Sequence, residues 1–173
     1  MSAQRIAIVT GAARGQGAAI VRRLRTDGFL VAAADVLVEE LRAGVDALGD
    51  PGVMAVTLDV TSAQQWSAAV ADVVEKFSGV TALVNNAGVL HRATLSDETQ
   101  AGFERSWRVN CLGPFLGIQA VLERLRGSAG AAICASSGRP RLTGPGFCPS
   151  RMLMKFSVCS IWRWISGIVL VAL

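Results

Sequence analysis

Short apolar runs and amphipathic stretches alternate along most of the chain. Apolar runs of four to six residues predict strands that are buried on both faces, whereas apolar residues spaced three and four apart predict helices. The predicted strands are Arg5 to Thr10, Phe29 to Ala34, Val53 to Leu58, Thr81 to Val84 and Ala131 to Ala135. Strands that alternate with helices favour an α/β fold, a doubly wound parallel sheet in three α/β/α layers.

Amphipathic patterns predict a helix after each of the first four strands. The predicted helices are Gly15 to Asp27, Leu37 to Leu48, a helix capped by Thr61 or Ser62 and ended by Gly79, and Gly102 to Leu125. The third helix should bury an aromatic and apolar stripe formed by Trp66, Val70, Val73 and Phe77. Pro114 lacks an N–H, so it should kink the last helix or loosen the turn before it.

The last of these helices carries a second apolar stripe. Its inward residues are predicted to be Trp107, Val109, Leu112, Leu116, Val121 and Leu125. Asn110 lies just before Pro114, where a loosened turn would expose backbone groups. It is therefore either a polar residue in an imperfect helix or a site residue.

A glycine-rich turn, Thr10 to Gly17, joins the first strand to the first helix. Glycines at 11, 15 and 17 allow a tight reversal, and they let backbone N–H groups approach a phosphate at the helix N-terminus. Arg14 and Gln16 lie on either side of Gly15 in this turn and are further candidates for cofactor contacts. By itself this turn leaves purely structural glycines as an equal alternative.

Asp35 follows the second strand, about 20 residues after the glycine turn, where dinucleotide folds place the acid that binds a ribose. A carboxylate there accepts hydrogen bonds from a ribose 2′-hydroxyl and repels a 2′-phosphate, which favours NAD over NADP. The alternative role is a helix N-cap. Arg14 argues in the opposite direction, because a basic residue in the turn can hold a 2′-phosphate. With both residues considered, NAD is the favoured cofactor and NADP the less favoured one.

Two further motifs make the pattern specific: Asp59 and Val60 follow the third strand, and Asn85-Asn86-Ala87-Gly88 follows the fourth. With T-G-x-x-x-G-x-G at the first turn and Asp35, this arrangement resembles the short-chain dehydrogenase/reductase family from Arg5 to Ser137. The resemblance implies an NAD-dependent oxidoreductase that transfers hydride between a nicotinamide and a small-molecule ketone or secondary alcohol.

The resemblance also implies roles for individual residues. The pyrophosphate would be held by Gly11, Gly15 and Gly17, the adenosine ribose by Asp35, and the adenine by Asp59 and Val60. Asn86, Ala87 and Gly88 would form the floor of the site. Asn110 would help hold a proton-relay water, and Ser137 would be the catalytic serine.

The family pattern is interrupted after Ser137. The family places a tyrosine, the general acid or base, 13 residues after the serine, and a lysine four residues later. Here those positions hold Ser150 and Met154, and the chain contains no tyrosine. Lys155 is the nearby candidate for the lysine, and counting back from it reaches Arg151. Because neither Ser150 nor Arg151 can replace the phenol of the tyrosine, we expect weak activity or none.

We therefore expect a dinucleotide-binding domain at 1–137 and a divergent, apolar and basic tail at 138–173 in place of the family's active-site helix and later strands. The expected fold is thus truncated at its C-terminus, through a shifted reading frame, alternative splicing or early termination. A non-catalytic NAD-binding pseudoenzyme is the alternative function. The β-branched end of the tail should add a sixth strand at the sheet edge or, if unpaired, aggregate.

Charge and composition limit the other partners. Residues 1–123 hold all 13 acidic residues, and residues 124–173 hold seven basic ones, but these are scattered singly, so no nucleic-acid partner is expected. The last apolar stretch is too short and too interrupted for a membrane span. A single histidine and four cysteines without ligand spacing predict reduced thiols and no metal site. Together with the lack of a leader, reduced thiols predict a cytoplasmic location. The family is usually homo-oligomeric, but the divergent tail argues against that here.

Overall fold

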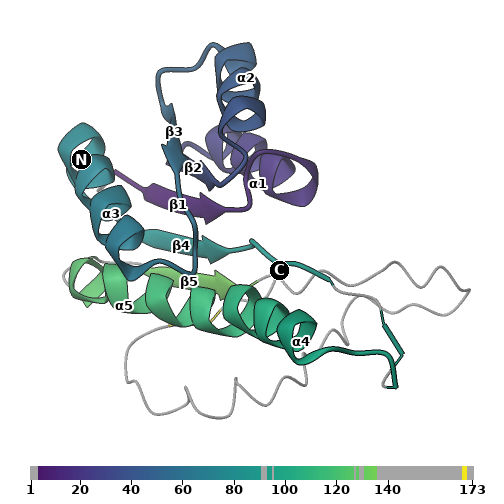
Figure 1. The fold of residues 1–173 in the computed structure, drawn as a ribbon. Coiled ribbons are helices and arrows are strands. Elements are labelled where there is room, and N and C mark those ends of the chain that lie inside the picture. The colour runs from purple at the N-terminus through teal and green to yellow at the C-terminus, as the bar shows by residue number, and fades with distance from the viewer. Residues whose placement is uncertain are drawn as a thin grey trace, which may run out of the picture.

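The computed structural model describes residues 4–90, 93–94, 96–126, 128, 131–135 and 169–170. Its strands form one parallel sheet in the order β3-β2-β1-β4-β5-β6 (Figure 1). They are β1 (Ile6–Thr10), β2 (Leu30–Asp35), β3 (Val53–Thr57), β4 (Ala82–Asn85), β5 (Ala132–Ala135) and β6 (Val169–Leu170). The chain runs outward from β1 to β3 and then returns to the other side of β1. This order confirms the doubly wound fold predicted from the sequence.

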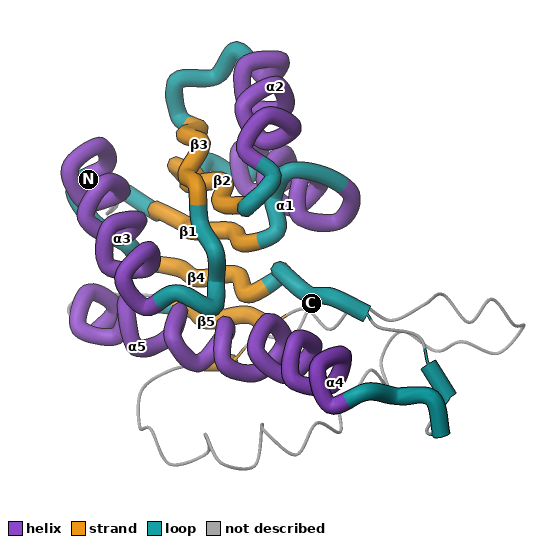
Figure 2. The backbone as a smooth tube through the Cα atoms, viewed as in Figure 1, coloured by secondary structure: helices purple, strands orange, loops and turns teal. Residues whose placement is uncertain are grey.

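Helices cover both faces of the sheet. They are α1 (Gly15–Thr26), α2 (Val38–Leu48), α3 (Ala63–Phe77), α4 (Gln100–Trp107), the π-helix η1 (Arg108–Leu112) and α5 (Gly113–Arg126). Figures 1 and 2 show α1 and α2 on one face and α3 and α5 on the other. Within the described residues no helix combines the length and the hydropathy needed to cross a membrane.

Alternate side chains of β1 enter two separate cores, as expected for a strand covered on both faces. Ile6 and Ile8 pack into the core beneath α3 and α5. Val9 packs into the other core with Val21 of α1 and Leu41 of α2. The glycine turn thus leaves a strand whose position is fixed from both sides.

The two ends of α3 can be compared with the residues predicted from the sequence. Ser62 caps α3 as one of the two predicted candidates, since its Oγ accepts a hydrogen bond from the Gln65 N–H at 3.3 Å. At the other end Ser78, with φ 70°, takes the left-handed conformation, so α3 ends one residue before the predicted Gly79. The stripe predicted for this helix is buried throughout.

The predicted loosening before Pro114 is a π-helical turn. The N–H of Gly113 donates to the carbonyl of Arg108, five residues earlier. Pro114 has no N–H for the carbonyl of Asn110, which removes one bond of a regular α-helix at this point. Trp107, predicted to point inward, is 49% exposed, because α4 extends beyond the sheet and buries none of its residues (Figure 1).

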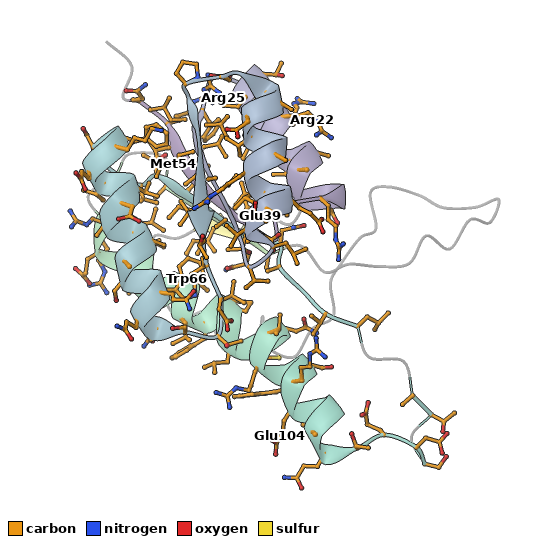
Figure 3. The ribbon with its side chains drawn as sticks, turned by 45° about the horizontal axis from the view of Figure 1, so that its top comes forward. Arg22, Arg25, Glu39, Met54, Trp66 and Glu104 are labelled. Carbon is orange, nitrogen blue, oxygen red and sulfur yellow. The ribbon has the colours of Figure 1, made fainter. Side chains whose placement is uncertain are left out.

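The far end of α1 is fixed by an ion pair with the loop before β3. Arg25, labelled in Figure 3, donates from Nε to Asp50 Oδ2 at 2.9 Å and from Nη2 to Asp50 Oδ1 at 2.8 Å. The Gly52 N–H donates to the same Oδ1 at 2.8 Å. These bonds hold the pKa of Asp50 below its ordinary value of 3.8, because they favour the charged carboxylate.

The edge of the sheet next to β5 carries the sixth strand predicted from the β-branched tail. Val169 of β6 lies beside Ala132, and Leu170 lies beside Ile133, in parallel register. The first two residues of β5, Ala132 and Ile133, are therefore paired on both sides, by β4 and by β6.

Candidate functional site

The candidate site begins at Thr10, the last residue of β1. Its buried hydroxyl donates to the carbonyl of Val84 at 3.3 Å and accepts from the N–H groups of Asn86 and Ala87, each at 3.0 Å. A single side chain thus ties the ends of β1 and β4 together. The sequence interpretation gave Thr10 no role of its own, although it is the first residue of the T-G-x-x-x-G-x-G motif and a polar residue at the end of an otherwise apolar strand.

Asn86 reinforces this connection from the opposite side. Its Nδ2 donates to the carbonyls of Thr10 at 2.9 Å and Gly11 at 3.2 Å. The predicted floor of the site therefore lies directly against the start of the glycine turn. The side-chain amide of Asn86 holds backbone there, so its contribution to a ligand site is to position the turn.

The first and last glycines of the turn have no room for a side chain. Gly11 has φ 66°, and a Cβ there would lie 2.8 Å from the Cα of Ala87. A Cβ on Gly17 would overlap the carbonyl oxygen of Gly11 and lie 2.7 Å from Asn86 Nδ2. These two positions require glycine because the turn, the start of α1 and the floor segment are in direct contact.

Gly15 differs, because it faces open space. It has φ 57°, and nothing lies within 4 Å of the position that a Cβ would take. It is the first residue of α1, whose N-cap, Arg14, makes no side-chain capping bond, and the first turn contains no acidic residue. Gln16 follows it and is exposed. The start of α1 at Gly15, called the cradle below, thus combines free space with helix N–H groups of the kind that suit an anion.

Asp35 lies beside this turn, at the end of β2. Its Oδ2 accepts from the Ala13 N–H at 2.9 Å, and its Oδ1 accepts from the Leu37 N–H at 3.1 Å. The N-cap of α2 is Leu37, so the alternative interpretation of Asp35 as an N-cap is wrong. An ionised carboxylate has about four acceptor positions, which leaves capacity for ribose hydroxyls.

Arg14 extends from the turn towards α2. Its Nη1 lies 3.6 Å from Oε2 of Glu40, and both side chains are largely exposed. The sequence interpretation considered Arg14 as a phosphate ligand but did not consider Glu40. No sequence pattern links the two residues, because their contact depends on how α2 packs against the turn.

Asp59 and Val60, the predicted adenine contacts, organise the start of α3. Asp59 Oδ1 accepts from the Thr61 N–H and from Thr61 Oγ1, each at 2.8 Å. Val60 is buried, and its carbonyl accepts from Trp66 Nε1 at 3.0 Å. Both residues are fixed at the carboxyl end of β3, on the same edge of the sheet as the turn, and their adenine role stays a prediction.

Asn110 lies against the segment that follows β4. Its Oδ1 accepts from the Val89 N–H at 2.9 Å, and its Nδ2 donates to the Val89 carbonyl at 2.8 Å. A Cβ on Gly88 would stand 3.3 Å from the same Oδ1. The structure therefore places Asn110 beside Gly88 and Val89, and both polar atoms of its side chain hold backbone; its role in a site stays a prediction.

Two predicted catalytic residues, Ser137 and Lys155, lie outside the described residues. The same is true of positions 150, 151 and 154, where the family's tyrosine and lysine were sought. The described part of the site consists of the glycine turn, Asp35, the ends of β3 and β4, and Asn110.

A family comparison identifies this arrangement. The family model described as short chain dehydrogenase matches residues 5–149. The chain belongs to the short-chain dehydrogenase family. Its parallel sheet with flanking helices is therefore that of a short-chain dehydrogenase, a family that binds a nicotinamide cofactor.

Individual short-chain dehydrogenases resemble the chain over most of its length. A 3-alpha-(or 20-beta)-hydroxysteroid dehydrogenase of Mycobacterium bovis is 38% identical, covering 89% of this chain and 59% of the relative. The trans-4-hydroxycyclohexanecarboxylate dehydrogenase of Sinomonas cyclohexanicum is 34% identical over 78% of this chain and 55% of the relative. The chain thus spans less than two thirds of the length of these relatives.

A solved short-chain dehydrogenase supports the same fold. The 3-ketoacyl-(acyl-carrier-protein) reductase of Brucella melitensis, complexed with NADH, superimposes with a TM-score of 0.71 at 26% sequence identity. The alignment covers 76% of this chain and 56% of the reductase.

Proposed function

We propose that this chain binds NAD along the glycine turn and Asp35, and that it is an NAD-dependent oxidoreductase acting on a ketone or a secondary alcohol. The observation that carries this proposal is the uncapped start of α1 at Gly15, open to a ligand and next to the Asp35 carboxylate. The positive end of the helix suits a pyrophosphate, and the carboxylate suits ribose hydroxyls. NADP is the less favoured cofactor.

The remaining contacts follow the family's motifs. Asp59 and Val60 would bind the adenine, and Asn86, Ala87 and Gly88 would form the floor. When bound, the nicotinamide supplies or accepts the hydride. The chain's own contribution is to position this group against the strand ends that Thr10 and Asn86 hold together.

Proton transfer would fall to residues that the family resemblance assigns. We assign Ser137 to the substrate oxygen and Asn110 to a relay water, and we take Lys155 as the candidate for the lysine that holds the nicotinamide ribose. The 173 residues contain no tyrosine. General acid–base catalysis by a positioned side chain contributes about 10²- to 10⁴-fold. Turnover should therefore be weak.

The substrate class is inferred from the chemistry that the relatives' names state. A hydroxysteroid and a hydroxycyclohexanecarboxylate are both secondary alcohols on a saturated ring. We propose that the substrate here is likewise a small-molecule secondary alcohol, or the corresponding ketone. The proposal includes no nucleic-acid or membrane partner.

The proposal assigns binding to residues 1–137 and treats 138–173 as a divergent tail. A second candidate function is NAD binding without catalysis. The observation that favours it is the absence of tyrosine from the sequence, together with Ser150 and Met154 at the positions counted from Ser137.

A titration followed by a turnover assay tests both functions. NADH is added to the purified chain and binding is measured by calorimetry; NAD reduction is then followed with trans-4-hydroxycyclohexanecarboxylate and with a 3α-hydroxysteroid. Binding with turnover supports the oxidoreductase, and binding without turnover supports the second candidate. If the folded chain binds no NADH, both proposals are wrong.

A further inference from the structure

Glu40 is the residue from which a further inference follows. It lies in the first turn of α2, and its Oε2 is 3.6 Å from Nη1 of Arg14, the basic residue of the glycine turn. The side chain of Arg14 is 73% exposed and that of Glu40 is 51% exposed. Arg14, the basic residue next to Gly15, is thus paired with Glu40.

The pair borders the place where a ribose would bind. Asp35 accepts hydrogen bonds from the N–H of Ala13, next to Arg14, and from the N–H of Leu37, three residues before Glu40. A Cβ on Gly44 would lie 3.9 Å from the carbonyl oxygen of Ala13. Positions 40 and 44 share one face of α2, because residues four apart lie above one another on a helix. That face is therefore turned towards the glycine turn.

We propose that Glu40 determines cofactor specificity by holding Arg14 away from a 2′-phosphate. This inference rests on the proposed function, since it concerns the same nucleotide site. A guanidinium is the favoured partner of a phosphate, so an unpaired Arg14 would offset the repulsion that Asp35 exerts. Because Arg14 is paired with Glu40, it must release the Glu40 carboxylate before it can bind a 2′-phosphate. The Glu40 carboxylate adds a second negative charge beside Asp35, and both effects disfavour NADP.

The expected effect is moderate, because the pair is exposed. Surface ion pairs contribute little in water, and salt screens them. Releasing Arg14 and removing one negative charge should together strengthen NADPH binding by about threefold to tenfold. NADH has no 2′-phosphate, so its affinity should stay within about twofold.

The test measures the dissociation constants of NADH and NADPH for the full chain, at low ionic strength, in four proteins. They are the wild type, Glu40→Gln, Glu39→Gln and the double variant Arg14→Gln/Glu40→Gln. Glu39, labelled in Figure 3, is the matched control: it lies in the same first turn of α2, is exposed and carries the same charge. Circular dichroism confirms that each protein is folded.

The inference predicts a lower NADPH dissociation constant for Glu40→Gln alone, no change for Glu39→Gln, and loss of the gain when Arg14 is also replaced. Equal gains in both single variants would show that only net charge matters, and this would overturn it. An unchanged ratio of NADPH to NADH affinity in Glu40→Gln, or a gain that persists without Arg14, would also overturn it while leaving the proposed function intact. If no protein binds NADH, the proposed function fails and this inference fails with it.

Discussion

Two glycine pairs with the same spacing, one in the turn after β1 and one in α5, have different structural roles. Gly11 and Gly15 lie four residues apart in the turn after β1, and both have positive φ, 66° and 57°. Gly113 and Gly117 also lie four residues apart, but they belong to α5. The first pair shapes the turn, with Gly11 packed against Ala87 and Gly15 facing open space, whereas both members of the second pair let a helix approach the core.

The difference lies in what each missing side chain would contact. A Cβ on Gly113 would lie 2.8 Å from Val60 Cγ2, and one on Gly117 would lie 2.7 Å from Trp66 Cζ2. Figure 3 shows Trp66 between α3 and α5. By contrast, a Cβ on Gly15 meets nothing within 4 Å. Glycine spacing therefore does not separate an open position from a packing contact; the atoms around the missing side chain do.

The largest effect is expected from Gly17→Ala, the third glycine of the turn, which packs against Gly11 of the first pair. Its Cβ would overlap the Gly11 carbonyl, so the turn must shift and its N–H groups lose their alignment. Hydrogen bonds to charged groups contribute about 1.5–3 kcal/mol each, so NADH affinity should fall by about 100-fold. Calorimetric titration measures the loss.

The matched control is Gly44→Ala, an exposed helical glycine whose Cβ would have 3.9 Å to its nearest neighbour. It should keep NADH affinity and gain about 0.5–1 kcal/mol in stability. Undiminished binding by Gly17→Ala would show that the turn does not hold the cofactor.

In the other half, Gly117→Ala should reduce stability and spare binding. The added methyl group meets the buried Trp66 ring, and overpacking of this kind costs about 1–3 kcal/mol. Urea unfolding measures the free-energy change, with Gly44→Ala again as the helical control. An increase in stability would show that α5 can move away from α3 without strain, and the contrast between the glycine pairs would be lost.

Much of this arrangement is predictable from the sequence, because strands buried on both faces leave a clear apolar pattern. The predicted strands agree with the structure to within one or two residues, and the glycine turn and Asp35 lie side by side as predicted. What could not be predicted depends on packing across distant segments. The contacts of Thr10 with Asn86 require β1 and β4 to be neighbours, and the contact of Arg14 with Glu40 requires α2 to dock on the turn.

The exposure of Trp107 was predicted wrongly for a related reason. A periodic pattern indicates one face of a helix, but it does not show where the sheet beneath that helix ends. α5 packs on the sheet and buries Val121 and Leu125, as predicted, whereas α4 continues past the edge of the core. The roles of Ser137 and Lys155 stay predictions.

A smaller effect is expected from Asn110→Ala, which removes both hydrogen bonds to Val89. Each such bond contributes about 1 kcal/mol net, and less where water can replace it, so the loss of stability should be about 1 kcal/mol. Urea unfolding checks this, with Gln119→Ala on the exposed side of α5 as the control. If both variants unfold alike, Asn110 does not fix the segment after β4.

The smallest effect concerns the support of α1, which begins at Gly15 of the first glycine pair. The pKa of Asp50 is lowered in the folded chain, so its ion pair with Arg25 stabilises the fold above the unfolded-state pKa, near 3.8. This contribution is lost as pH falls through the lower, folded pKa. Asp50→Asn should therefore weaken the dependence of the urea midpoint on pH below about pH 4.

Asp72→Asn is the control, since Asp72 is exposed on α3 and has no ion pair among the described side chains. Its urea midpoint should follow the same pH dependence as that of the wild type. A dependence in Asp50→Asn as steep as that of the wild type would contradict the prediction.

The hydroxyl of Thr10 should slow the hydrogen exchange of two backbone amides. Hydrogens on the amides of Asn86 and Ala87 are held by that hydroxyl rather than by a strand partner. They should therefore exchange with deuterium as slowly as those of the sheet interior, although both residues lie beyond the end of β4. Opening this junction would require the two central strands to separate, so the floor of the cradle should be among the last parts of the chain to unfold.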